Sequence, residues 1–241
     1  MKGKHWLVGV LLAVAFVSAQ ASAYTVSPLR MAMEPVGESA TERLRIVNDG
    51  SNPITLSISV SRAEIAEDGT VTQTPADDKF LIFPPQTIVA PEKTQMIQIR
   101  YVGDPQLASS QLYLIRTSQV PIDFTEGGNV GLKVGIDFVT AAEVAPPGSA
   151  ATLSVASFDA ADAGYEVRIS NAGNRHDQLA NYDLVVTGST GSTTVPLKDI
   201  EFGETTRIAP QGARRFTVPA AMLQEIGTVA EMRLRAQADQ G

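Results

Sequence analysis

Few residues of this chain have the types and spacing that catalysis requires. His176 and Asp177 are neighbours in a loop-like stretch, Asn171–Gln178, and a Ser-His-Asp triad can be imagined around them. Triad residues are, however, selected by their positions in space rather than in sequence, and the chain has no Gly-x-Ser-x-Gly turn. We therefore interpret His176 as an exposed loop residue and expect no catalytic site.

The other candidates for chemistry are equally weak. The carboxylate pairs Glu67-Asp68 and Asp77-Asp78 lie next to turns, where acidic residues are normally solvated or bonded to local backbone. The spacing of a zinc site or of an acidic calcium loop is absent, and so is a glycine-rich phosphate loop. The chain has no cysteine, which excludes thiol catalysis and cysteine-ligated metals. We predict a protein that is not an enzyme and needs no cofactor and no metal.

The first 23 residues have the three-part layout of a secretory signal peptide. Lys2 and Lys4 precede an apolar run, Trp6–Val17, and the small residues Ala-Ser-Ala follow at 21–23. The apolar run is shorter than the roughly 20 residues that cross a bilayer. We therefore expect export to the periplasm with cleavage of residues 1–23, and no membrane insertion.

Cleavage lowers the formal net charge from −7 to −9, because Lys2 and Lys4 are lost. An acidic chain without a cluster of Lys and Arg is unsuited to nucleic acid or to an anionic membrane surface, so neither partner is expected. Without disulfides, stability must come from buried apolar area. The length of the mature chain predicts two domains.

The elements that would position any site are strands. From Tyr24 to Thr140, short alternating apolar segments are separated by turn residues, which is typical of all-β proteins. Apolar residues alternate with small polar ones over 54–60, and further strands are predicted at 94–102 and 112–120. Helical spacing is almost absent from this part of the chain.

Residues 141–150 have the composition of a linker, with Pro146-Pro147-Gly148 preventing a continued strand or helix. The strand pattern continues more loosely over 151–241, where only 220–226 could form a helical turn or two. We therefore predict two immunoglobulin-like β-sandwich domains, residues 24–140 and 151–241.

The longest alternation in the chain lies at Val130–Phe138. Its apolar face includes Val130, Leu132, Val134 and Ile136. A core-facing strand of the first domain would show the same pattern. The segment is, however, the last strand of its domain and runs straight to the linker. At a sheet edge it would offer free backbone groups and a row of apolar side chains to another chain.

The first half of the sequence resembles the periplasmic chaperones of the chaperone–usher pathway, which fold and deliver pilus subunits. The resemblance is clear from Tyr24 to Thr140 and weaker after it. The segments that carry it are Val-Ser-Pro-Leu-Arg at 26–30, Ile-Val-Asn-Asp-Gly at 46–50, Phe-Pro-Pro at 83–85 followed by Pro91 and the strand at 97–100, Leu-Tyr-Leu-Ile-Arg at 112–116 running to Gln-Val-Pro at 119–121, and the alternating strand.

The resemblance implies a boomerang of two immunoglobulin-like domains that donates its alternating strand to a pilus subunit lacking a final strand. The subunit would then be delivered to an outer-membrane usher. The side chains expected to fill the subunit's groove are Val130, Leu132, Val134 and Ile136. In this family the subunit's C-terminal carboxylate is anchored between the domains by an Arg on the first strand and a Lys near the end of the donor strand. Arg30 matches the first of these positions.

The second position departs from the family pattern. Our alignment places Asp137 there, and Lys133 lies four residues earlier on the same face of the strand. An Asp cannot bind a carboxylate unless one of the two is protonated. Either Arg30 anchors alone, or Lys133 substitutes, or the register differs by a residue or two.

Other interpretations of the same sequence stay open. One is a secreted or surface-attached immunoglobulin-like module, such as an adhesin or a matrix component. Another is a periplasmic hydrolase that relies on His176, for which His176→Ala would abolish activity with folding intact. Self-association of the free protein is a further open question, because exposed apolar edges aggregate.

Overall fold

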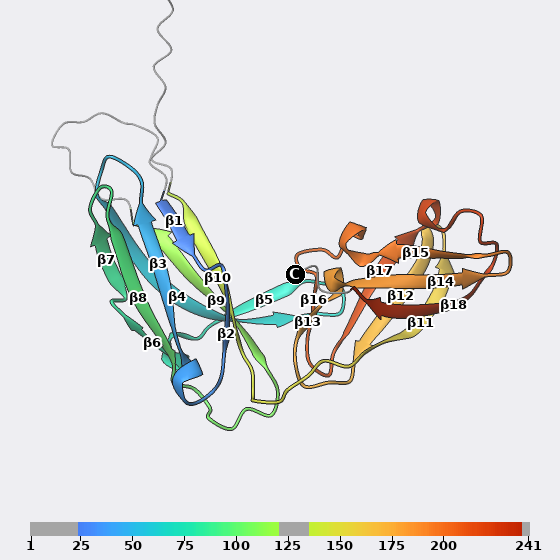
Figure 1. The fold of residues 1–241 in the computed structure, drawn as a ribbon, viewed down its shortest axis with the longest axis horizontal. Helices are drawn as coiled ribbons and strands as arrows, with labels where there is room; N and C mark the ends of the chain where they lie inside the picture. Colours follow the sequence, from blue (N-terminus) through green and yellow to red (C-terminus); the bar gives the residue numbers. More distant parts are fainter. Residues whose placement is uncertain (1–23, 121–134, 238–241) are drawn as a thin grey trace, which may run out of the picture.

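The computed structural model describes residues 24–120 and 135–237 and shows two β-sandwich lobes that meet at a bend (Figure 1). One hydrophobic core cluster lies in the first lobe and a second cluster in the other. This arrangement confirms the predicted all-β fold of two immunoglobulin-like domains in a boomerang. Within the described residues, no helix combines the length and the apolar character needed to cross a membrane.

The first domain consists of two sheets, one with the order β1-β3-β8-β6 and one with the order β2-β10-β9-β4-β5, where β7 also pairs with β4. The strands are β1 (Tyr24–Ser27), β2 (Arg30–Met33), β3 (Thr41–Asn48), β4 (Ile54–Ile65), β5 (Val71–Pro75), β6 (Phe80–Phe83), β7 (Gln86–Val89), β8 (Thr94–Tyr101), β9 (Gln111–Gln119) and β10 (Asp137–Val144). The apolar residues of the alternating pattern face the core, as predicted: Leu44 and Ile46 of β3 are fully buried, as is Ile97 of β8.

The second domain has the sheets β11-β12-β17 and β15-β14-β18 and the short pair β13-β16. The strands are β11 (Leu153–Ala161), β12 (Gly164–Asn171), β13 (Asp177–Gln178), β14 (Tyr182–Gly188), β15 (Ser192–Pro196), β16 (Arg207–Ile208), β17 (Ala213–Pro219) and β18 (Val229–Ala236). The described helices are single 3₁₀ turns: η1 (Glu38–Ala40), η2 (Asp77–Lys79), η3 (Leu179–Asn181), η4 (Leu197–Asp199) and η5 (Ala220–Leu223). The last of these is the helical turn predicted within 220–226.

The N-terminal segment changes sheets within a few residues. β1 pairs antiparallel with β3 in one sheet, whereas β2 pairs parallel with β10 in the other. The register of the second pair sets Arg30 opposite Ala141 and Ala32 opposite Glu143. β2 therefore lies beside the end of β10 that leads into the second domain.

β10 reaches further along the chain than the sequence pattern indicated. It runs through Val144, so the first four residues of the predicted linker, 141–144, are paired with both β9 and β2. In the described part of the chain, residues 137–140 pair with β9 alone. Residues 141–144 of β10 are thus internal in the sheet, whereas residues 137–140 lie at its edge. The domain boundaries themselves stay predictions.

Candidate binding cleft between the domains

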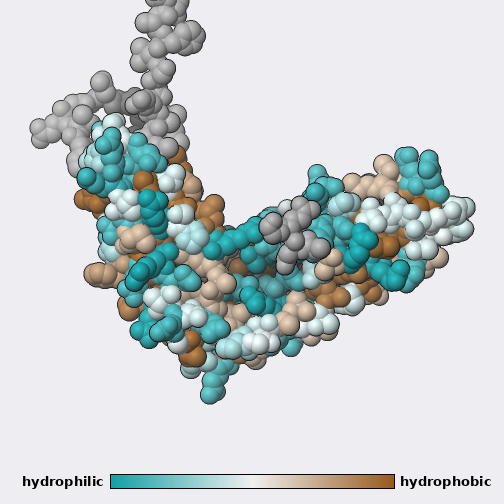
Figure 2. All heavy atoms as spheres, viewed as in Figure 1, coloured by the Kyte–Doolittle hydropathy of each residue, from teal (hydrophilic) through white to brown (hydrophobic). Residues whose placement is uncertain are grey.

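A polar pocket of about 390 Å³ lies between the two domains. The first domain contributes residues 30–32 of β2 and Glu143 of β10, and the second contributes Arg207 of β16 and residues 175–178. Figure 2 shows hydrophilic residues on the inner side of the bend, where the two lobes meet. The pocket is therefore suited to a charged or hydrogen-bonding group rather than to an apolar ligand.

The strand alternation of β2 explains how Arg30 reaches this pocket. Met31 and Met33 point into the core of the first domain and are buried, so the side chains of Arg30 and Ala32 point the other way. Both of the latter residues line the pocket. Arg30 thus lies at the predicted place between the domains, and its role as an anchor stays a prediction.

Most of the predicted donor strand cannot be compared with the structure. Val130, Leu132 and Val134 lie outside the described residues, and so does Lys133. Ile136 is described: its side chain is half-buried and packs against the core of the first domain, and its carbonyl oxygen accepts a hydrogen bond of 2.6 Å from the hydroxyl of Tyr24.

The ring of Tyr24 also packs edge-on against Phe138, with centroids 4.9 Å apart. The start of β10 is therefore held by β1 as well as by β9. Since Ile136 and Phe138 are two residues apart, both contacts place the apolar face of this segment toward the domain core.

Asp137, which our alignment set at the family's second basic position, is not among the residues that line the pocket. Its carboxylate forms an exposed ion pair of 3.4 Å with the guanidinium of Arg116 on the neighbouring strand. The carboxylate of β10 that does line the pocket is Glu143, six residues further along the strand. Glu143 Oε1 accepts a hydrogen bond of 3.4 Å from Nε of Arg175 in the second domain.

The pocket contains cations that the sequence did not single out. Arg175 and Arg207 both belong to the second domain and both line the pocket. Neither lies in a recognisable motif, and the second domain is the part of the chain where the resemblance is weak. The pairing of β13 with β16, which sets Gln178 opposite Arg207, brings these two segments together. No signal in the sequence predicted that pairing.

The prediction that His176 is an exposed loop residue is wrong. The side chain is only 8% exposed, and its Nδ1 lies 2.7 Å from the hydroxyl of Ser110 in the first domain. The same hydroxyl accepts a hydrogen bond of 2.9 Å from the backbone N–H of His176. Burial, with smaller contributions from Arg207 and Arg62, lowers the pKa of His176 to about 4. The residue is a neutral contact between the domains, because the loop that carries it is pressed against the first domain.

Further hydrogen bonds hold the same loop. The amide of Asn171, which is buried, donates to the carbonyl oxygens of Arg175 (2.7 Å) and Ala209 (3.1 Å). Its side-chain oxygen accepts from the N–H groups of Thr152 and Gly173, both at 3.0 Å. The turn predicted at Asn171-Ala172-Gly173 therefore also fixes the segment that lines the pocket.

A second contact between the domains comes from the long hairpin of β4 and β5, which points toward the second domain (Figure 1). Its tip, residues 66–70, carries Glu67, whose carboxylate accepts hydrogen bonds from Arg168 (2.9 Å) and Arg215 (3.0 Å). These bonds, chiefly the one from Arg168, lower the pKa of Glu67. The carbonyl oxygen of Glu67 also accepts from the N–H of Arg215 at 2.8 Å.

No family model and no curated protein matches the sequence. The fold, in contrast, is similar to solved structures. The class 5 fimbriae chaperone CfaA is 11% identical, with a TM-score of 0.59 over 90% of this chain and 99% of that chain. The chaperone DraB of E. coli is 15% identical, with a TM-score of 0.56 over 90% and 97%.

A chain in the structure of the Salmonella enterica SafA pilin in complex with the SafB chaperone is 15% identical, with a TM-score of 0.54 over 91% of this chain and 98% of that chain. The coverage is nearly complete in these three comparisons, so the similarity includes both domains. The protein therefore has the two-domain fold of the fimbrial chaperones.

Proposed function

We propose that this chain is a periplasmic chaperone that binds pilus subunits by donating the strand at 130–136, and that it delivers them to an outer-membrane usher. In the solved structures, one chain of similar fold comes from a chaperone–tip adhesin complex and another from a complex of a pilin with its chaperone. The observation that carries the proposal is the pairing of β10. Among the residues that the structure describes, this strand pairs at 137–140 with β9 on one side only, directly after the alternating segment.

An edge at this place can accept another chain. A strand added there would pair with backbone groups of β10 and its preceding residues, while alternate apolar side chains supply specificity. Burying the side chains of Val130, Leu132 and Val134 is worth about 1.5–3 kcal/mol for each residue before ordering costs. Ile136 already packs partly on the first domain, so it would contribute less than the other three.

The position of Arg30 supplies the other half of the proposal. β2 lies against β10 with Arg30 opposite Ala141, so the pocket lies beside the C-terminal half of the strand that follows the proposed donor segment. At ~3.3 Å per residue, an extended strand spans about 36 Å from Ala141 back to Val130. A subunit strand along that edge would reach the pocket with its terminal carboxylate, where Arg30 would set its register. A slip of one residue would turn every apolar side chain away from the groove.

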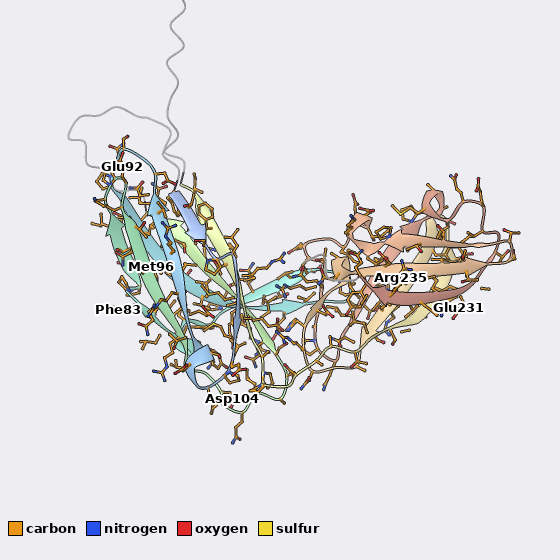
Figure 3. The ribbon with its side chains drawn as sticks, viewed as in Figure 1. Phe83, Glu92, Met96, Asp104, Glu231 and Arg235 are labelled. Carbon is orange, nitrogen blue, oxygen red and sulfur yellow. The ribbon has the colours of Figure 1, made fainter. Side chains whose placement is uncertain are left out.

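The test is co-expression in a bacterial periplasm with the pilin-like proteins encoded beside this gene, followed by pull-down. We expect a stable one-to-one complex that Leu132→Glu/Val134→Glu abolishes and that Arg30→Ala weakens. The matched control is Leu81→Glu/Phe83→Glu, because these side chains are 60% and 72% exposed on β6 of the other sheet, where Figure 3 labels Phe83. If no pilin-like protein is captured, or if the variant in the donor strand captures it as well as the control does, the proposal is wrong.

A further inference from the structure

The charges in the pocket between the domains do not balance. Its lining includes the cations Arg30, Arg175 and Arg207 and the carboxylates Glu143 and Asp177. The guanidinium of Arg175 is satisfied by Glu143. Among the described residues, Arg30 and Arg207 form no ion pair with a carboxylate.

The second carboxylate of the lining is also occupied. Asp177 accepts hydrogen bonds from the hydroxyl of Tyr182 (2.6 Å) and from the N–H of Gln178 (2.7 Å), both within the second domain. One more negative group is therefore needed to neutralise the pocket. Because a guanidinium presents its donors as a planar fork, a carboxylate is a good geometric match.

Arg30 and Arg207 come from different domains but lie close together. Both side chains line the same pocket. Burial is the main reason why the pKa of Arg207 is lowered; the carboxylate of Glu143 opposes this shift, and the positive charge of Arg30 adds to it. Two guanidinium groups repel each other, and a carboxylate placed between them removes this repulsion while gaining a charge-assisted hydrogen bond from each.

Arg207 is presented by a rigid scaffold. The fully buried guanidinium of Arg214 donates to the carbonyl oxygens of Arg207, Thr205 (2.8 Å) and Phe202 (2.5 Å). Gly69 of the hairpin tip packs directly against the guanidinium of Arg214. The loop that ends in Arg207 is thus fixed by a contact with the first domain. This contact limits the positions that the side chain of Arg207 can take.

From these contacts we infer that Arg207 of the second domain is the second cation of the carboxylate site, and that Arg30 and Arg207 bind the subunit's terminal carboxylate together. The inference rests on the proposed function and deepens it. It assigns a second basic group to the pocket in place of the donor-strand candidate Lys133, and it gives the second domain a direct part in binding.

The test uses a peptide copy of the C-terminal strand of the captured subunit, made once with a free terminal carboxylate and once with a terminal amide. We expect the unchanged chain to prefer the carboxylate form. Arg207→Gln should weaken binding of that form by about tenfold to a hundredfold and leave the amide form unaffected, so that the preference falls to the part that Arg30 supplies. Arg207→Lys keeps the positive charge but lacks the planar fork of donors. Its affinity for the carboxylate form should therefore lie between those of the unchanged chain and of Arg207→Gln.

Arg235→Gln is the matched control, because it removes the same charge from the same domain. Arg235 lies on β18 and pairs with Asp183 rather than lining the pocket (Figure 3). Thermal melting of each variant checks that it is folded. Equal weakening of both peptides by Arg207→Gln, or no weakening, would overturn the inference and leave the proposed function standing. Failure of the unchanged chain to bind either peptide would overturn both.

Discussion

Replacing Gly69 by Ala should loosen the contact between the two domains. This glycine is buried in the hairpin tip with a φ of +94°, a backbone conformation that side chains disfavour. A Cβ atom there would overlap the carbonyl oxygen of Phe202 and the guanidinium of Arg214, both in the second domain. The tip must therefore withdraw or the loop beneath it must move.

The expected cost has two parts. A left-handed conformation costs an alanine about 1–2 kcal/mol wherever it occurs. Withdrawal of the tip also removes one backbone hydrogen bond, from Arg215 N–H to Glu67, and two ion pairs made by the Glu67 carboxylate. At ordinary values for such contacts, this loss adds about 1–3 kcal/mol.

Gly148→Ala separates the two parts. Gly148 also has a positive φ, +73°, and a Cβ there would have open space around it. The assay is equilibrium urea unfolding followed by circular dichroism, since the chain from Tyr24 on has no Trp. Small-angle X-ray scattering, in parallel, reports the angle between the domains.

Gly69→Ala should be less stable than Gly148→Ala by about 1–3 kcal/mol and should show a larger radius of gyration. It should also lower affinity for the carboxylate peptide, although Gly69 lies outside the pocket lining. If the two alanine variants have the same stability and the same scattering, the hairpin tip does not hold the domains together and the reasoning is wrong.

Two further predictions concern the loop that lines the pocket. The native pKa of His176 is about 4 and its unfolded value is about 6.5, so the unfolded chain binds more protons between these two pH values. The neutral form of His176 therefore contributes at most ~3 kcal/mol of stability, which is complete above pH 6.5 and is lost as the pH falls to 4. His176→Asn, which keeps an acceptor for Ser110, should flatten this part of the stability profile measured by urea unfolding at each pH, and an unchanged profile would contradict the assignment. Asn171→Ala should lose about 2–5 kcal/mol of stability in the same assay, because four hydrogen bonds disappear. The control Asn52→Ala, at an exposed position, should change stability by less than about 0.5 kcal/mol. Similar losses for the two variants would show that the buried turn does not fix the loop.

Periodicity predicted the fold because each strand has one buried face. Ile54 and Leu56 of β4 are buried as the alternation required, and the turns at Asn48 and Asn171 are closed by the side-chain bonds that Asn favours. The same principle could not find the end of β10. Ala141 and Ala142 have no strong strand preference, and they pair because β9 and β2 lie on either side of them.

The site was harder to predict because its parts come together only through tertiary contacts. Arg30 was found because a resemblance marked it, while Arg207 and Glu143 had no local signal. His176 was misread for the same reason: a polar loop residue is normally exposed, and only the packing of the loop against Ser110 buries it. Contacts between residues of different domains produce no periodic pattern in the sequence.

Residues of both domains line the pocket, and this has a consequence for the free energy of binding. If Arg30 and Arg207 bind one carboxylate, the ligand joins the two domains, so binding must stabilise their contact by the same free energy by which that contact favours binding. The hairpin tip and the pair formed by Ser110 and His176 hold the domains before any ligand arrives. Such preorganisation lowers the cost of ordering the site. On the proposed function, a subunit would be recognised along the first domain's strand, and the contact between the domains would determine how well its terminal carboxylate is held.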